Sequence, residues 1–296
     1  MSKIAVIGAG VMGNGIAHIF AQYGFETILI DRSEEALKKA ADAISKNLDR
    51  QVKKQSITEE DKQNTLNNIT LHTSFDIKLK GCILVVEAAT ENKAVKLEIF
   101  KTLDAICDAE TILASNTSSI SITEIANATK RADKIIGMHF MNPVPMMPLV
   151  EIINGYSTSK MTTEFVINIS KKLDKIPIAA HDYPGFVANR ILMPMLNEAM
   201  YALHEGVAGV AEIDGIMKLG MGHPMGPLQL ADFIGLDTCL SILNVLYDGF
   251  KLPKYAPCPL LINMVNAGNL GKKTQIGFYD YKTESKTLIV APTFIK

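Results

Sequence analysis

Short runs of apolar, β-branched residues alternate with helical stretches over the first half of the chain. Six runs predict strands: Ile4–Ile7, Thr27–Ile30, Ile83–Glu87, Ile112–Ser115, Ile135–His139 and Leu149–Ile153. Strands that alternate with helices form right-handed crossovers and therefore a parallel sheet. The pattern predicts an α/β fold with a doubly wound, mostly parallel sheet.

One long polar stretch interrupts this alternation. Residues 33 to 68 are highly charged and have a helical composition, with Thr58 followed by Glu60 and Asp61 at a second helix start. We predict two helices joined near residues 56–58, inserted into the sheet domain. Such a pair is either a solvated charged face or a lid whose lysines reach a phosphorylated substrate.

The hydrophobic pattern changes after residues 182–185. From Phe186 to Gly268 the chain is helical in pattern, rich in Leu and Met, and punctuated by Pro and Gly. We predict a first domain over residues 1–184 and an all-helical second domain over residues 185–296. Phe186–Tyr201 and Leu228–Leu246 are apolar around much of a helix circumference, which predicts a subunit interface in the second domain.

Composition narrows the class of protein. The formal net charge of −1 argues against a nucleic-acid partner, which favours a strongly basic face. The four cysteines form no C-x-x-C pair and lie beside no histidine at ligand spacing, so we expect buried thiols in a reducing compartment and no metal. Neither a membrane span nor a signal peptide is expected, so we predict a cytoplasmic protein.

A glycine motif follows the first predicted strand. Residues 8–13 read Gly-Ala-Gly-Val-Met-Gly, so Gly8, Gly10 and Gly13 stand in a G-x-G-x-x-G spacing around Val11 and Met12. Gly8 permits a tight turn, Gly10 leaves room for a pyrophosphate, and the helix N-terminus attracts the phosphates. Asp31 ends the next strand 21 positions after Gly10, where its carboxylate would bind ribose hydroxyls. We predict a Rossmann-type NAD site, with NADP left open because Arg32 follows Asp31.

His139 differs from the other histidines because it ends a predicted strand, where parallel sheets bind ligands. The chain returns through a Pro-rich loop and places Glu151 among apolar residues. A carboxylate in an apolar strand needs a partner, and His139 is the best placed one. Such a pair would fix the imidazole tautomer of a general base, which takes the hydroxyl proton of an alcohol while the hydride leaves for the nicotinamide. The alternative is a structural ion pair.

Two polar clusters complete the candidate site. Ser115–Ser119 follows a predicted strand and serves either as a helix cap or as a hydroxyl donor to substrate. Asn189 lies early in the first helix of the second domain, where its amide would reach across a cleft.

Several motifs together resemble the L-3-hydroxyacyl-CoA dehydrogenase family. They cover nearly the whole chain and are the segments 8–13, 86–92, 115–119, 139–145, 184–190 and 222–227. The length and the lack of a hydratase domain are similar to stand-alone bacterial members that act on 3-hydroxybutyryl-CoA. The resemblance implies an NAD-dependent oxidoreductase that interconverts (S)-3-hydroxybutyryl-CoA and acetoacetyl-CoA. It also implies a homodimer, because members of the family are usually dimeric.

The resemblance also implies residue roles. His139 is the general base and Glu151 orients it, while Ser118 and Asn189 align the substrate oxygen with the base. The further implied contacts are Glu91, Lys96 and Lys273 toward NAD, Asn142 toward nicotinamide and substrate, and Lys53 and Lys54 toward CoA.

Two other functions stay open. One is a related dehydrogenase of a free hydroxy acid or sugar acid, and the other is a non-catalytic NAD-binding structural protein. Acyl-chain preference, reaction direction and pathway also stay open, because butanoate metabolism, lipid synthesis and fatty-acid degradation all fit the sequence.

Overall fold

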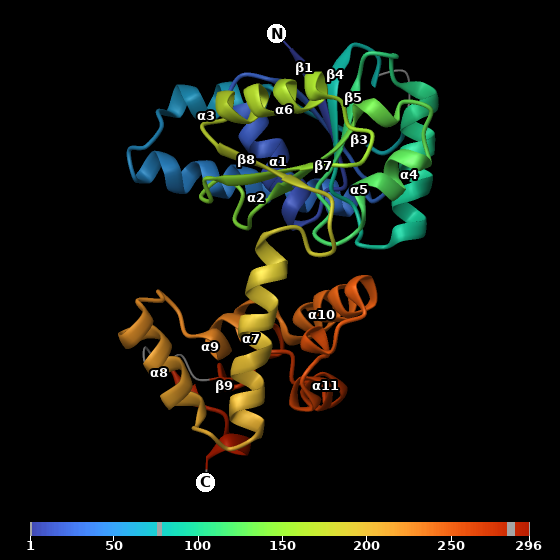
Figure 1. The fold of residues 1–296 in the computed structure, drawn as a ribbon. Coiled ribbons are helices and arrows are strands. Elements are labelled where there is room, and N and C mark those ends of the chain that lie inside the picture. The colour runs from blue at the N-terminus through green and yellow to red at the C-terminus, as the bar shows by residue number, and fades with distance from the viewer. Residues whose placement is uncertain (1, 76–78, 283–287, 296) are drawn as a thin grey trace. The chain divides into compact units, whose positions relative to one another are not determined.

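An eight-stranded sheet forms the centre of the first part of the protein, in a computed structural model that describes residues 2–75, 79–282 and 288–295 (Figure 1). The strand order is β3-β2-β1-β4-β5-β6-β7-β8. The strands are β1 Lys3–Ile7, β2 Glu26–Ile30, β3 Ile69–His72, β4 Cys82–Glu87, β5 Ile112–Ser115, β6 Ile135–Phe140, β7 Leu149–Asn154 and β8 Ile176–His181. All neighbours are parallel except β6 and β7. The predicted doubly wound, mostly parallel sheet is confirmed.

The six predicted strands are present, and two edge strands were missed. Strand β3 is partly exposed along its length, and β8 contains Pro177 and is largely exposed. Edge strands bury little surface, so they lack the continuous apolar runs that mark central parallel strands. The antiparallel pairing of β6 with β7 follows from the short loop 141–148, because a parallel crossover needs a longer connection.

Helices cover the sheet and bury its apolar faces. They are α1 Val11–Gln22, α2 Glu34–Lys53, α3 Glu59–Asn67, α4 Lys93–Ile106, α5 Ile122–Asn127 and α6 Lys160–Lys172. Central strands and α1 bury a common core that includes Ile4, Val6, Phe20 and Leu84. This core fixes the carboxyl ends of β1, β4, β5 and β6 relative to one another.

The predicted helical pair is α2 and α3. Helix α3 begins with a capping box, in which Thr58 Oγ1 accepts from Asp61 N at 3.0 Å and an Asp61 oxygen accepts from Thr58 N at 2.9 Å. Leu37, Ile44 and Leu48 give α2 a buried stripe, and both helices pack on α1. The pair is therefore anchored through its apolar face, and its charged face remains exposed.

The second unit is helical, and the division of the chain falls between Tyr183 and Pro184. Its helices are α7 Ala188–His204, α8 Val210–Met221, α9 Pro227–Ile234, α10 Leu236–Phe250 and α11 Pro259–Asn266. The apolar run 228–246 is not one helix, because Gly235 adopts φ +103° and α9 and α10 meet at 97°. Two short strands, β9 Tyr279–Asp280 and β10 Ile289–Val290, form an antiparallel pair that the sequence analysis did not predict.

Two buried aspartates connect the elements of the second unit. Asp214 accepts from Leu228 N at 2.8 Å and Gln229 N at 2.9 Å, and so caps the start of α9. Asp232 accepts from Phe278 N at 3.0 Å and Tyr279 N at 2.9 Å. Burial raises the pKa of Asp232 to about 6, although these donors oppose the shift. The segment that carries β9 is therefore fixed to α9 by buried polar contacts.

The four cysteines are free and buried, as predicted. Burial raises the pKa of the Cys107 and Cys239 thiols to about 12, so neither is a reactive thiolate near neutral pH. Within the described residues, no single helix has the length and apolar character to cross a membrane, whereas the bent pair α9 and α10 passes that test together. The same residues contain no cluster of three or more acidic, His or Cys side chains suited to a metal ion.

Candidate active site

The glycine turn joins β1 to α1 at the carboxyl edge of the sheet. Gly8 has φ +101°, and a side chain there would place its Cβ 2.6 Å from the carbonyl oxygen of Ala88. A Cβ on Gly13 would overlap the carbonyl of Gly8, whereas one on Gly10 would meet nothing within 4 Å. Gly8 and Gly13 are therefore required for close packing of the turn, and the face of Gly10 is open to a ligand.

A pocket of about 590 Å³ lies beside this turn. Gly8, Gly10, Asp31, Arg32 and Thr90 are among the residues that line it. Asp31 accepts hydrogen bonds from the backbone N–H groups of Ala9 at 2.8 Å and Ser33 at 2.9 Å. The carboxylate thus holds the glycine turn, and its remaining lone pairs are available to a bound molecule.

His139 and Glu151 lie directly opposite each other in the β6–β7 pair. Nδ1 of His139 is 2.6 Å from Oε2 of Glu151, and the two residues are only 6% and 4% exposed. The predicted contact is present because the short loop sets the antiparallel register. A carboxylate can only accept, so the hydrogen lies on Nδ1 and the neutral ring presents Nε2 as an acceptor.

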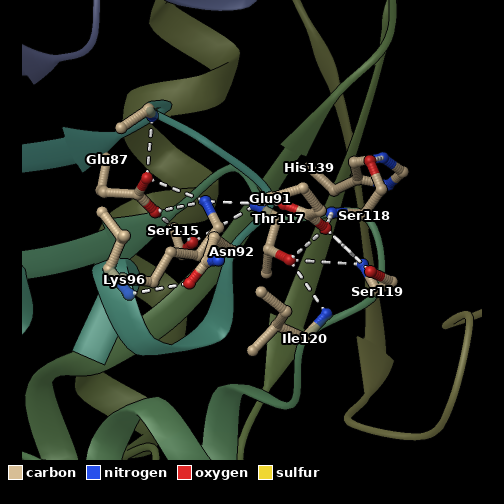
Figure 2. A network of polar contacts seen from close by, with 12 residues as sticks. Glu87, Glu91, Asn92, Lys96, Ser115, Thr117, Ser118, Ser119, Ile120 and His139 are labelled. Atoms are coloured by element: carbon tan, nitrogen blue, oxygen red, sulfur yellow. Dashed lines mark hydrogen bonds and ion pairs between the residues drawn. The ribbon is translucent and has the colours of Figure 1, made fainter. Parts of the chain in front are cut away.

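Ser118 approaches the other side of the imidazole. Its Oγ lies 3.0 Å from Nε2 of His139, so the ring lies between Ser118 and Glu151. Figure 2 shows Ser118 on the loop after β5, facing His139 on the neighbouring strand. The arrangement of hydroxyl, imidazole and carboxylate is one that can accept and return a proton.

Glu91 holds the loop that carries Ser118. One of its oxygens accepts from Thr117 Oγ1 at 2.7 Å, Ser118 N at 2.9 Å, Ser119 N at 3.1 Å and Ser119 Oγ at 2.9 Å (Figure 2). The segment Ser115–Ser119 is thus not the cap of the next helix, because Ser121 is the N-cap of α5. The hydroxyl of Thr117, the amide of Ser118 and both donors of Ser119 converge on Glu91 instead.

Beneath Glu91 lies a buried ion pair between Glu87 and Lys96. The Lys96 ammonium is 2.8 Å from each oxygen of Glu87 and 3.6 Å from Oε2 of Glu91, and Lys96 is 2% exposed. Ser115 Oγ also donates to Glu87 at 2.7 Å. Burial raises the pKa of Glu91, but the charge of Lys96 and the donors of Thr117, Ser119 and Ser118 outweigh it and the pKa lies below its ordinary value. Glu91 is therefore ionised at neutral pH.

The sequence analysis included Glu87 and Asn116 in its motifs but gave neither residue a role in this site. Glu87 ends an apolar strand, the same signal that identified Glu151, so it could have been found. Asn116 accepts from Phe140 N at 2.9 Å and so fixes the end of β6 beside His139. No local pattern marks that contact, because the two residues are 24 positions apart and meet only where β5 and β6 end side by side.

The remaining candidate residues lie on other segments of the chain. Asn142 is exposed on the loop after β6, and Lys53 and Lys54 are exposed at the end of α2. Asn189 and Lys273 belong to the second unit, where Asn189 is nearly buried and Lys273 forms an ion pair with Asp237. The structure therefore brings His139, Glu151, Ser118, Glu91 and Lys96 together in the first unit.

Comparison with known proteins identifies the family. Residues 3–183 match the family described as "3-hydroxyacyl-CoA dehydrogenase, NAD binding domain", and residues 185–281 match its C-terminal domain. The chain belongs to the 3-hydroxyacyl-CoA dehydrogenase family. Residues 3–183 are accordingly its NAD-binding domain, and the protein is an NAD-dependent oxidoreductase.

Relatives match over nearly their whole length. A 3-hydroxybutyryl-CoA dehydrogenase of Bradyrhizobium diazoefficiens is 53% identical over 95% of this chain and 96% of its own. The human mitochondrial hydroxyacyl-coenzyme A dehydrogenase is 43% identical, over 95% of this chain and 92% of its own. The crystal structure of (S)-3-hydroxybutyryl-CoA dehydrogenase from Ralstonia eutropha, 50% identical, superposes with a TM-score of 0.93 and covers 96% of this chain and 100% of its own.

Proposed function

We propose that the protein interconverts (S)-3-hydroxybutyryl-CoA and acetoacetyl-CoA with NAD. The observation that carries this proposal is the imidazole of His139, which lies between Ser118 and Glu151 in the NAD-binding unit. Relatives that match over nearly the whole chain are named for this substrate, which supports the acyl chain assigned here.

His139 acts as the general base in this proposal. Nε2 accepts the proton of the substrate's C3 hydroxyl, and Glu151 stabilises the imidazolium that forms 2.6 Å away. Ser118 donates to the substrate oxygen and holds it in line with Nε2, with Asn189 assigned a second contact to that oxygen. Bound NAD supplies the hydride acceptor at its nicotinamide. In the reverse direction His139 returns the proton to the carbonyl oxygen of acetoacetyl-CoA.

The pocket beside the glycine turn supports part of the NAD assignment. We assign the pyrophosphate to the turn around Gly8, Gly10, Val11, Met12 and Gly13, where a helix N-terminus and an open glycine face attract it. Asp31 binds the adenosine ribose, since its carboxylate lines the same pocket. Glu91, Lys96, Ser118, Asn142 and Lys273 are assigned to the rest of the dinucleotide.

The CoA and subunit assignments extend this proposal. Lys53 and Lys54 are assigned to the CoA phosphates, because both are exposed cations at the carboxyl end of α2. Ser118 and Asn142 are assigned to the acyl-CoA substrate. Residues 185–296 are assigned to substrate binding and to a homodimer interface. Exposed apolar side chains support the interface, and they include Ile191, Ile216, Leu219 and Met221. We also propose a cytoplasmic location.

Replacement of His139 by Gln tests the proposed chemistry. We expect the rate of acetoacetyl-CoA reduction, followed by loss of NADH absorbance, to fall by roughly 10²–10⁴-fold, because general acid–base catalysis is worth about that factor. NADH affinity, measured by fluorescence titration, should change little. Unchanged turnover would remove the assignment of the base.

The same assay separates the other two functions. The wild-type protein should reduce acetoacetyl-CoA much faster than free acetoacetate. A preference for the free acid would indicate a hydroxy-acid dehydrogenase, and NADH binding without turnover of either substrate would indicate a structural nucleotide-binding protein.

A further inference from the structure

The loop that joins the strands of His139 and Glu151 is held by a buried lysine. Lys175 precedes β8, and its ammonium donates to the carbonyl oxygens of Val144 at 2.7 Å and Met147 at 2.8 Å. Lys175 is only 7% exposed. Burial lowers the pKa of Lys175, with the charge of Asp174 opposing the shift. The two bonds to carbonyls compensate for the loss of water around the ammonium.

The side chain of Val144 in this loop packs on the first helix. Val144 is buried, and a Cβ added to Gly15 of α1 would lie 2.9 Å from the Cβ of Val144. Such contacts are closer than side chains tolerate, so Gly15 has to be glycine for the loop to lie here. The loop is therefore held both by Lys175 and by the helix that begins at the glycine turn.

This loop links three parts of the site. It connects His139 on β6 to Glu151 on β7, carries Asn142, and lies against α1 through Val144. Strand β8 continues from Lys175 and pairs with β7, with Leu149 opposite Ile176. A shift of the loop would therefore move the base relative to the nucleotide helix, and small displacements of reacting groups reduce turnover strongly.

We propose that Lys175 is a positioning residue, whose ammonium fixes the 141–148 loop and thereby aligns His139 and Asn142 with the NAD site. This inference rests on the proposed function. Lys175 touches neither the base nor the glycine turn, and it acts through the carbonyls of Val144 and Met147 and the packing of Val144 on Gly15.

Lys175→Met tests the proposal, because the side chain keeps a similar length and loses its charge and donors. We expect kcat for acetoacetyl-CoA reduction to fall roughly 10- to 100-fold. The Kd for NADH, measured by fluorescence titration, should rise roughly 3- to 10-fold, as loss of one hydrogen bond does. Lys172→Met is the matched control on exposed α6, and it should leave kcat and Kd within about 2-fold of wild type, as surface substitutions do.

A double substitution asks whether Lys175 acts through the base. In the His139→Gln background, Lys175→Met should lower the residual kcat by less than about 2-fold, because the aligned group is already absent. An equal loss in both backgrounds would overturn the proposal, and so would wild-type kcat and Kd in Lys175→Met itself. If Lys175 is purely structural, Lys175→Met should lower the thermal midpoint and reduce kcat by the same factor in the wild-type and His139→Gln backgrounds.

Gly15→Ala decides the question if Lys175→Met does not fold. The added methyl group displaces Val144 from the α1 side, so kcat should fall and the NADH Kd should rise in a folded protein. A wild-type kcat and a wild-type Kd for NADH in Gly15→Ala would overturn the proposal. Failure of the proposed function would show differently, as a wild-type protein that does not reduce acetoacetyl-CoA or a His139→Gln variant that is fully active.

Discussion

The imidazole of His139 and the carboxylate of Glu151 face each other across two antiparallel strands, with 2.6 Å between Nδ1 and Oε2. This is the point where an otherwise parallel sheet reverses direction. The reversal makes the contact, because antiparallel neighbours are directly paired at a fixed register. The geometry fixes the ring's tautomer and leaves Nε2 toward Ser118.

Glu151→Gln tests that relationship. The amide keeps the shape of the side chain but removes the negative charge that stabilises an imidazolium, and its NH2 group favours the wrong tautomer. We expect kcat to fall by roughly 10²–10⁴-fold with little change in NADH affinity. Glu164→Gln, on exposed α6, is the control in the same steady-state assay. Near-normal turnover in Glu151→Gln would show that the pair is structural.

Glu91→Gln should loosen the Ser118 loop. A neutral amide cannot hold four donors on one oxygen as a carboxylate does, and hydrogen bonds to charged groups are the stronger ones. We expect kcat to fall roughly 10-fold or more. Amide hydrogen exchange over residues 117–119 should become faster. Glu124→Gln, at an exposed ion pair with Lys93, should change neither, and unchanged exchange in Glu91→Gln would contradict the role given to this carboxylate.

Asp31→Ala should weaken NADH binding for two reasons. The substitution removes the proposed ribose contact and leaves the N–H groups of Ala9 and Ser33 without their carboxylate acceptor. We expect the Kd for NADH to rise roughly 10-fold, and the ratio of NADPH to NADH affinity to increase because a negative charge is lost. Asp42→Ala, on the exposed side of α2, serves as the control in the fluorescence titration. An unaltered Kd would place the ribose elsewhere.

His18 should make the first unit less stable in acid. It is fully buried in α1, and burial, followed by the charge of Lys175, lowers its pKa to about 4 while a hydrogen bond with Gln22 opposes the shift. A depressed pKa means that the unfolded chain binds the proton first, so stability is present above about pH 6.5 and is lost as the pH falls toward 4. The shift corresponds to about 3 kcal/mol of the free energy of unfolding.

Denaturant unfolding of His18→Leu between about pH 7 and pH 4.5 measures this contribution. The unfolding free energy of the wild type minus that of the variant should decrease as the pH falls, because only the wild type loses the contribution of His18. Wild type and variant are compared at each pH because Asp232, with its pKa raised to about 6, adds stability to both proteins as the pH falls over part of the same range. His204→Gln, at the exposed end of α7, should follow the wild type, and a pH-independent difference for His18→Leu would refute the assignment.

The sequence by itself determined what depends on local spacing. The glycine turn, the central strands and the helical pair with its Thr58 cap all follow from residues near one another in the chain. The contact of His139 with Glu151 could also be predicted, because a short loop joins two strands and a carboxylate in an apolar strand needs a partner.

Tertiary structure alone decided the contacts between distant segments. Glu91 gathers the backbone of residues 118 and 119, Asn116 fixes Phe140, and Lys175 reaches Val144. Edge strands β3 and β8 form because their backbones pair with neighbouring strands, and their own side chains bury little surface. These features arise from packing of the whole sheet, and a linear pattern of apolar and polar residues does not record which segments that packing brings together.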